Sequence, residues 1–143
     1  FNLLGPFDPS PAGVTKAEVF SWKSVTYLGE TPDVRPFLAG SHVFVLPTFY
    51  REGMPRSILE AMASGRAIVT TNVPGARATV VDGVNGFLVH PKDVAALAAT
   101  LTKLCEQPEL VSALGQASRK LAEEKFEVGR INRMIISAMM EQA

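Results

Sequence analysis

Residues 43–71 read VFVLPTFYREGMPRSILEAMASGRAIVTT and contain two apolar runs separated by a helical pattern. The first run, Val43–Leu46, is uniformly apolar and ends at Pro47, which predicts a strand covered on both faces. A helix from about Pro55 to Ser64 and a second strand, Ala67–Thr71, are expected to follow. Strand, helix and strand in this order indicate a parallel unit with a helical crossover.

The same alternation extends to both sides of this unit. Short strands are predicted at residues 1–5, 25–28 and 87–89, and helices at 15–24 and 34–39, from Asp93, from Pro108 and over 128–139. Thr15 and Glu18 have the spacing of a capping box at the first helix. Around Val73–Gly75 and at Asn85-Gly86 we expect turns. The predicted fold class is therefore α/β, with a Rossmann-like parallel sheet and flanking helices.

Length and composition indicate a single domain with an ordinary core. The chain has 143 residues, of which 47% are hydrophobic and 20% charged. Its 14 Lys and Arg residues balance its 14 Asp and Glu residues, so no overall field attracts nucleic acid. We therefore expect no nucleic-acid partner, and any anion site has to be built locally.

The lone cysteine and the short apolar runs indicate a protein of the cytoplasm. Cys105 has no partner in the chain for a disulfide, which fits a reducing compartment, and it shares the apolar stripe of its helix, where we expect it to be buried. The longest apolar run has six residues, whereas a membrane-spanning helix needs about 20. Because Phe1 opens directly into a predicted strand, the chain is expected to start inside a longer protein.

Several common site chemistries have no pattern in this sequence. There is no Gly-Lys pair for a Walker-type phosphate loop, no G-x-G-x-x-G and no G-x-S-x-G. With two histidines 48 residues apart and neither Cys-x-x-Cys nor Asp-x-Asp, we expect no metal site and no bound cofactor.

The segment Tyr50–Met62 has the features of a ligand site. It follows the carboxyl end of a predicted buried strand, which is where open α/β sheets bind ligands. With Pro55 at the start of the helix, the amides of Met54, Arg56 and Ser57 are left without helical partners. These amides and the helix dipole would receive a phosphate or sugar hydroxyls, and Gly53 would let the ligand approach the backbone.

Glu60 has two possible roles in this segment. At 100° per residue, Ile58, Ala61 and Met62 share one stripe, while Arg56, Ser57, Glu60 and Ser64 fall on the opposite face. A carboxylate there can accept hydrogen bonds from the vicinal hydroxyls of a ribose. It can equally be the i, i+4 ion-pair partner of Arg56. Both readings stay open.

The longer run REGMPRSILEAMASGRAIVTTNVPG, Arg51–Gly75, contains Glu52 and Glu60 as a Glu-x7-Glu pair. It resembles the donor-site signature of retaining GT-B glycosyltransferases, above all the bacterial members that build lipopolysaccharide, capsule and other cell-surface polysaccharides. The similarity extends from about Val25 to Phe126. Asn72 stands where the family commonly has Asp, and Ala78 where it has Glu.

The resemblance implies a role for each matching residue. Glu52 would be the catalytic acidic residue that contacts the transferred sugar near its reacting carbon, and Glu60 would bind the nucleotide ribose. The amides at the N-terminus of the helix predicted from Pro55 would hold sugar hydroxyls and the diphosphate. A segment at the end of the strand predicted at 25–28 would line the base pocket. The donor-binding residues implied in these two places are Gly53, Met54, Arg56 and Ser57, and Tyr27, Leu28, Gly29 and Glu30. In such enzymes protein groups rather than a metal stabilise the leaving diphosphate.

The resemblance also implies how the chain is organised. Residues 1–143 would be a single nucleotide-sugar-binding domain, the C-terminal half of a GT-B fold. The N-terminal acceptor-binding domain and the first strand-helix unit, which supplies an Arg and a Lys for the diphosphate, would precede Phe1. This fragment alone is expected to be inactive, and an apolar last helix left without its other half would favour self-association.

The implied activity is transfer of a hexose from a UDP-sugar, or another NDP-sugar, to a glycan or lipid-linked acceptor. Such an enzyme would act in the cytoplasm, with peripheral association of the full-length protein at the inner face of the membrane. Two alternatives stay open. One is a non-catalytic nucleotide-sugar-binding subunit that needs a separate acceptor-binding chain. The other is a GT-B-like nucleotide-sugar epimerase, which needs an acid/base group beside the sugar.

Overall fold

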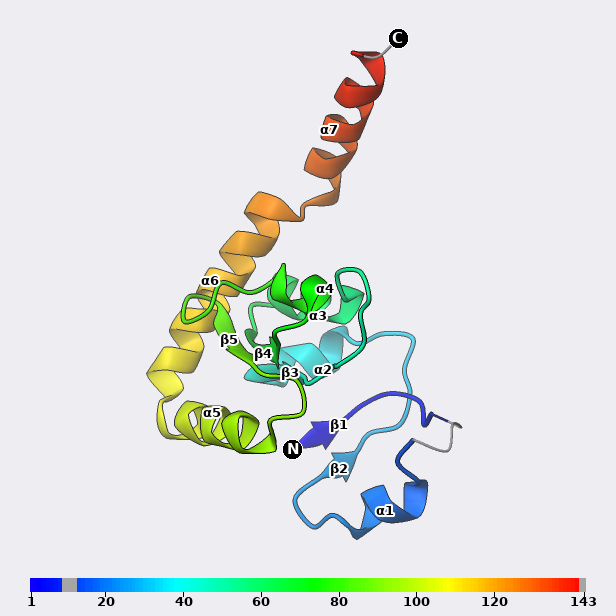
Figure 1. Ribbon diagram of the computed structural model, residues 1–143, viewed down its shortest axis with the longest axis vertical. Helices are drawn as coiled ribbons and strands as arrows, with labels where there is room; N and C mark the ends of the chain where they lie inside the picture. The colour runs from blue at the N-terminus through cyan, green and yellow to red at the C-terminus, as the bar shows by residue number, and fades with distance from the viewer. Residues whose placement is uncertain (9–12, 142–143) are drawn as a thin grey trace. The chain divides into compact units, whose positions relative to one another are not determined.

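The fold is described here from a computed structural model, in which residues 1–8 and 13–141 are described. The chain divides into two compact units, Phe1–Val34 and Arg35–Ala143, and each contains its own parallel sheet. Strands and helices alternate along the chain up to the helix that ends at Glu106, and two further helices follow it (Figure 1). The predicted α/β alternation is thus present in each unit.

The first unit is a small strand-helix-strand arrangement. Strand β1 (Asn2–Leu3) pairs in parallel with β2 (Thr26–Tyr27), and helix α1 (Lys16–Ser21) connects them. The ring of Tyr27 lies 4.7 Å from that of Phe7 and 6.1 Å from that of Phe20, centroid to centroid. Its hydroxyl donates a hydrogen bond to the carbonyl of Gly5 at 3.0 Å. These contacts hold the half-buried ring of Tyr27, while Val19 of α1 is the buried hydrophobic side chain in the described part of this unit.

The predicted capping box of α1 is confirmed. The Thr15 hydroxyl accepts a hydrogen bond from the amide of Glu18, and the Glu18 carboxylate reaches back to the Thr15 amide at 2.8 Å. The carboxylate also accepts from the Thr15 hydroxyl at 2.6 Å. These bonds to the charged form, first that from the hydroxyl and then that from the amide, lower the pKa of Glu18.

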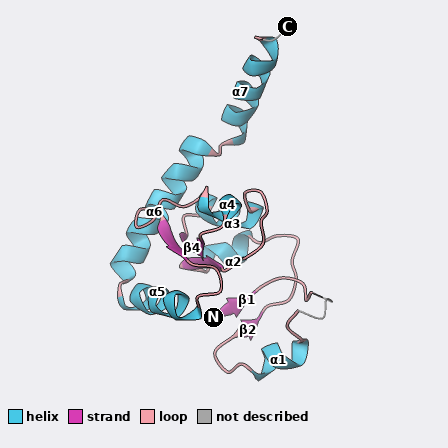
Figure 2. Cartoon of the chain, in the orientation of Figure 1, coloured by secondary structure: helices cyan, strands magenta, loops and turns pink. Residues whose placement is uncertain are grey.

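The second unit is built on a three-stranded parallel sheet in the order β3–β4–β5. In this sheet Val43 lies beside Ala67, and Ile68 lies beside Gly86. Figure 2 distinguishes the strands from the helices that connect them. The elements are α2 (Arg35–Ala39), β3 (Val43–Leu46), α3 (Arg56–Ala63), β4 (Ala67–Thr71), α4 (Pro74–Arg77), β5 (Gly86–Val89), α5 (Val94–Glu106), α6 (Pro108–Lys125) and α7 (Val128–Met140).

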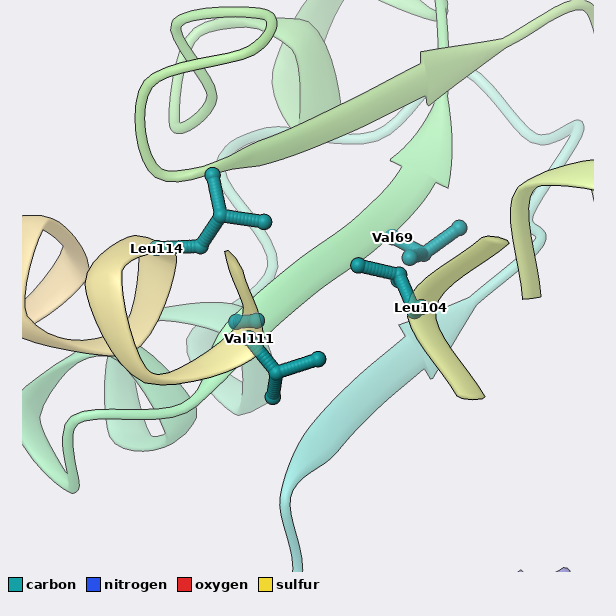
Figure 3. Close-up of a cluster of buried hydrophobic side chains, with 5 residues drawn as sticks. Val69, Leu104, Val111 and Leu114 are labelled. Carbon is teal, nitrogen blue, oxygen red and sulfur yellow. The ribbon is translucent and has the colours of Figure 1, made fainter. Parts of the chain in front are cut away.

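The core of this unit surrounds β4, whose five residues are all buried. On one face Val69 packs with Leu104 of α5 and with Val111 and Leu114 of α6 (Figure 3). Alternate residues of a strand point to opposite faces, so the buried Ile68 lies on the other side. Both faces of β4 are therefore covered, and burial of this apolar area holds the sheet to its helices.

Two burial predictions were wrong. Strand β3 is only half-buried along its length instead of covered on both faces, because in the described residues it pairs with β4 alone and so forms a sheet edge. Cys105 is exposed rather than part of the core. It lies 100° around α5 from Leu104, the helix's one buried residue, so the buried stripe is narrower than the apolar pattern suggested.

Of the two predicted turns, that around Gly75 differs from the structure, and that before Gly86 is present. Residues 74–77 form the short helix α4, with Pro74 in its first turn. Asn85 lies in the predicted turn and is also fully buried. Its side-chain oxygen accepts from the amide of Val81 at 2.8 Å, and its amide group donates to the carbonyl of Thr79 at 3.2 Å. Because both polar ends are satisfied, Asn85 holds the loop before β5 from the inside.

Helix α7 ends the described chain with its apolar side chains uncovered. None of its residues is buried, and Ile135, Ile136 and Met139 are each more than half exposed. The predicted bare face is thus present, while self-association through it stays a prediction. In residues 1–8 and 13–141, no helix has the length and hydropathy to cross a bilayer.

Substitution of Leu114 by Ala tests the core around β4. Leu114 is 1% exposed, so its truncation leaves a cavity, and we expect the free energy of unfolding to fall by about 2–5 kcal/mol. Urea denaturation followed by circular dichroism measures this change. The control is Val94→Ala, since Val94 is 77% exposed. A loss for Leu114→Ala no larger than that for the control contradicts this description of the core.

Candidate functional site

The loop after β3 lies at the edge of the sheet where the parallel strands end. Two threonines at the end of β4 hold the backbone that enters this loop. The Thr70 hydroxyl donates to the carbonyl of Leu46 at 2.7 Å, and the Thr71 hydroxyl donates to the carbonyl of Thr48. The carboxyl edge of a parallel sheet is where α/β proteins bind ligands, so residues 47–55 occupy the expected position.

A close backbone contact fixes the middle of the same loop. Gly75, in helix α4, is buried, and a Cβ atom there would overlap the carbonyl oxygens of Gly53 and Glu52. Only glycine lets the two backbones approach this closely. Residue 75 therefore sets how far residues 52 and 53 can lie from β4 and α4.

Glu52, the predicted catalytic residue, is exposed in this loop. Its carboxylate oxygen Oε1 lies 3.5 Å from the hydroxyl of Thr48, which is at the limit of a hydrogen bond. The same hydroxyl accepts from the amide of Tyr50 at 3.3 Å. Thr48 thus links the backbone of the loop to the carboxylate, which remains available to a ligand.

Helix α3 begins next to Glu52 with its amides unpaired. Its N-cap is Pro55, which makes no side-chain capping bond. Within the described chain, the amides of Gly53, Met54, Arg56 and Ser57 donate no hydrogen bond to another protein atom. The unpaired amides and the helix dipole, equivalent to about half a positive charge, favour an anion or hydroxyl oxygens at this end. The predicted donor-binding amides therefore lie together.

The predicted two faces of α3 are confirmed. Ile58, Ala61 and Met62 are fully buried, while the Glu60 side chain is 35% exposed and that of Arg56 is 91% exposed. Burial of the apolar stripe fixes the rotation of the helix, and with it the direction of the polar face.

Of the two readings of Glu60, the ion pair is present in the structure. The guanidinium Nε of Arg56 donates to Glu60 Oε1 at 3.0 Å. An exposed i, i+4 pair of this kind contributes about 0.3–0.5 kcal/mol. Such a weak pair leaves the carboxylate free to exchange partners, and the ribose-binding role stays a prediction.

The four residues predicted to line a base pocket belong to the first unit. Tyr27 is half-buried among aromatic rings, and the amide of Leu28 donates to the carbonyl of Leu3 at 2.8 Å. Gly29 has a φ of +81° and accepts a hydrogen bond from the amide of Gly5. Glu30 is exposed. Tyr27, Leu28 and Gly29 thus each have a contact that supports the fold of the first unit. A contact of these four residues with a base stays a prediction.

Sequence patterns gave no direct signal for four residues that shape the site. Thr48, Thr70 and Thr71 act through hydrogen bonds between segments, and Gly75 acts through a backbone contact 22 residues from Gly53. In the part of the chain that the structure describes, no group of three or more His, Cys, Asp or Glu side chains could hold a metal ion.

Comparison with known proteins finds one family over most of the chain. Glycosyl transferases group 1 matches residues 3–107. The capsular polysaccharide biosynthesis glycosyltransferase CapM of Staphylococcus aureus is 38% identical over 103 residues, which are 72% of this chain and 27% of CapM. The N,N'-diacetylbacillosaminyl-diphospho-undecaprenol alpha-1,3-N-acetylgalactosaminyltransferase of Campylobacter jejuni is 33% identical over 110 residues, 77% of this chain and 29% of that protein. The chain thus spans less than a third of the length of these relatives.

Solved structures agree with the fold. HepE of Anabaena in complex with UDP has a TM-score of 0.78 and 27% identity, covering 82% of this chain and 32% of HepE. HepE in complex with UDP-glucose has a TM-score of 0.77. The predicted fold class, α/β with parallel sheets and flanking helices of the GT-B glycosyltransferase type, is confirmed.

Replacement of Gly75 by Ala tests the contact that positions Glu52 and Gly53. The added methyl group has to displace their carbonyls, so we expect the amide resonances of residues 48–57 to shift and the free energy of unfolding to fall by about 1–3 kcal/mol. Two-dimensional NMR of the chain measures the shifts.

The matched control is Gly40→Ala, because a Cβ at Gly40 meets nothing closer than 3.6 Å. If Gly75→Ala leaves the resonances of residues 48–57 where they are in Gly40→Ala, the close contact does not position the loop.

Proposed function

The chain belongs to the glycosyl transferases group 1 family, and from this premise we propose that it is the nucleotide-sugar-binding domain of a retaining hexosyltransferase. The arrangement that carries the proposal is the loop of Glu52 and Gly53 leading into the unpaired amides of α3, with Glu60 one turn further on. The donor is a UDP-sugar or another NDP-sugar. The UDP and UDP-glucose complexes of HepE support a uridine-linked donor.

Each group at this end of the sheet has a distinct task in transfer. In the reaction, the bond between the anomeric carbon and the diphosphate oxygen breaks, a bond to an acceptor hydroxyl oxygen forms, and the proton of that hydroxyl passes to the departing diphosphate. The amides of Gly53, Met54, Arg56 and Ser57 would bind the donor's diphosphate and sugar hydroxyls, and would stabilise the negative charge on the departing diphosphate. The carboxylate of Glu52 would stabilise the positive charge that develops at the anomeric carbon.

Glu60 would bind the ribose hydroxyls through its carboxylate, which pairs with Arg56 when no ligand is bound. Two vicinal hydroxyls can donate to one carboxylate, and each charge-assisted bond contributes about 1.5–3 kcal/mol. The Arg56–Glu60 pair contributes less, so the ribose can displace it. The released guanidinium, which is highly exposed, would then be available to the diphosphate. Tyr27, Leu28, Gly29 and Glu30 would line the base pocket.

The acceptor would be a glycan or a lipid-linked glycan, most of which would be bound by a domain outside this chain. The relatives named for capsular polysaccharide and for a diphospho-undecaprenol acceptor support this class. An enzyme with a lipid-linked acceptor would act in the cytoplasm at the inner face of the membrane. Because the relatives are named as transferases, transfer is favoured over epimerisation. We also propose that the donor-binding function needs no metal, since the amides and the helix dipole supply the positive field.

Glu60→Gln tests the ribose contact. The amide keeps the shape of the side chain but removes its charge, so we expect the affinity of the chain for UDP to fall about fivefold. Isothermal titration calorimetry with UDP measures this.

Glu123→Gln is the control, because Glu123 forms the same kind of i, i+4 pair with Arg119 on α6, at 2.6 Å. Equal UDP affinities in the two variants would remove the ribose role of Glu60, and no UDP binding by the unsubstituted chain would remove the donor site.

Glu52→Ala, made in the whole protein, tests the catalytic role. The lost carboxylate acts in the transition state, so we expect kcat to fall about 10²–10³-fold while UDP affinity changes little. A transfer assay and calorimetry on the same preparation measure the two effects. If both quantities fall by the same factor, Glu52 is a binding residue only.

A further inference from the structure

Two exposed aromatic side chains next to Glu52 are not used by the proposed donor site. The rings of Phe49 and Tyr50 stack with centroids 4.4 Å apart and planes 28° from parallel. Phe49 is 50% exposed and Tyr50 is 61% exposed. Because both rings are at least half exposed, the stack does not belong to the hydrophobic core. Its exposed face lies at the ligand-binding edge of the sheet and is available to a partner.

A lysine from another strand end completes this surface. The Nζ atom of Lys92, in the segment after β5, lies 4.9 Å from the centroid of the Phe49 ring, within the range of a cation–π contact. The contact joins the loop after β3 to the loop after β5, across the end of β4. We call Phe49, Tyr50 and Lys92 the aromatic–cation platform.

The backbone holds Lys92 in an unusual conformation. Its φ is +65°, and it is the one non-glycine residue with a positive φ among those the structure describes. The next residue, Asp93, is fixed on both sides, because its amide donates to the carbonyl of His90 at 3.2 Å and its carboxylate caps α5 by accepting from Ala96 at 2.8 Å. Left-handed backbone at a bulky residue is uncommon and persists where its surroundings fix it.

Thr48 joins the platform to the catalytic loop. Its hydroxyl accepts from the amide of Tyr50 and lies 3.5 Å from the Glu52 carboxylate. Its carbonyl is held by Thr71. The aromatic stack and the carboxylate therefore belong to one short, supported segment, with the stack on the opposite side of Glu52 in the sequence from the donor-binding amides.

We propose that the aromatic–cation platform binds one pyranose ring of the sugar acceptor. The statement that the ring belongs to the acceptor rests on the proposed function. A pyranose has an apolar C–H face that packs on an aromatic ring, and hydroxyls at its rim that both donate and accept. Tyr50 offers its ring face and Glu52 offers an acceptor, while Lys92, which lies over Phe49, offers a donor once its side chain turns from that ring toward the bound sugar. An uncharged, hydroxylated ring fits this set, whereas a free phosphate would meet the Glu52 carboxylate.

The platform is tested by NMR titration of the ¹⁵N-labelled chain, with and without UDP. The probes are the methyl pyranosides of glucose, galactose and N-acetylglucosamine. Sorbitol is the acyclic control, and uridine tests whether a nucleoside base stacks on the aromatic rings instead. We expect at least one pyranoside to shift the amides of residues 48–52 and 92–93, and sorbitol to shift none of them.

Three variants separate the contributions of the platform. Tyr50→Ala is expected to weaken pyranoside binding about fivefold, and Tyr50→Phe to preserve it, because the ring face is retained. Lys92→Gly removes the ammonium while glycine adopts the same φ readily, and is expected to weaken binding about twofold. Phe20→Ala, at an exposed aromatic of the first unit, is expected to leave pyranoside binding unchanged.

Several results would overturn the proposal. They are the absence of shifts with every pyranoside, shifts with uridine alone at these amides, or equal losses in Tyr50→Ala and Tyr50→Phe. UDP affinity, measured on the same samples, separates this proposal from the donor site: we expect it unchanged in Tyr50→Ala. If the chain binds pyranosides but not UDP, the platform stands and the donor site falls.

Discussion

The loop between β3 and α3 is held in place by the elements that follow it in the chain. Thr70 and Thr71, at the end of β4, donate to the backbone of the loop at Leu46 and Thr48. Gly75 then brings α4 against the carbonyls of Glu52 and Gly53. Because β4 is buried on both faces, the position of the loop depends on the core of the second unit. These contacts therefore fix the positions of Glu52 and of the unpaired amides at the start of α3.

The spacing of apolar residues and the capping residues were enough to predict most of the helices and strands. The two apolar runs predicted the bounds of β3 and β4 as the structure has them. The Thr15–Glu18 spacing predicted the capping box of α1. The polar face of α3 followed from helical geometry, since Ile58 and Met62 have to be buried. Patterns of this kind are decided by neighbours in the sequence, so the sequence alone carries them.

Contacts between distant segments could not be predicted in this way. The turn at Asn85 was predicted, but the burial of its side chain, which hydrogen-bonds the backbone of Val81 and Thr79, was not. Cys105 matches an apolar stripe, but the sheet covers only the part of α5 around Leu104. Gly75 belongs to a turn-like sequence, and its close approach to Glu52 appears only once β4 and α4 are placed. The pairing of Arg56 with Glu60, by contrast, is local, and it is one of the two roles that helical spacing allowed for Glu60.

We propose that the unpaired amides of Gly53, Met54, Arg56 and Ser57 bind the diphosphate while Glu60 binds the ribose. A crystal structure of the chain with UDP bound tests it most directly. In that structure we expect diphosphate oxygens within hydrogen-bond distance of these amides, the ribose hydroxyls on the Glu60 carboxylate, and Arg56 turned away from Glu60. UDP bound at another edge of the sheet, with the Arg56–Glu60 pair intact, would contradict it.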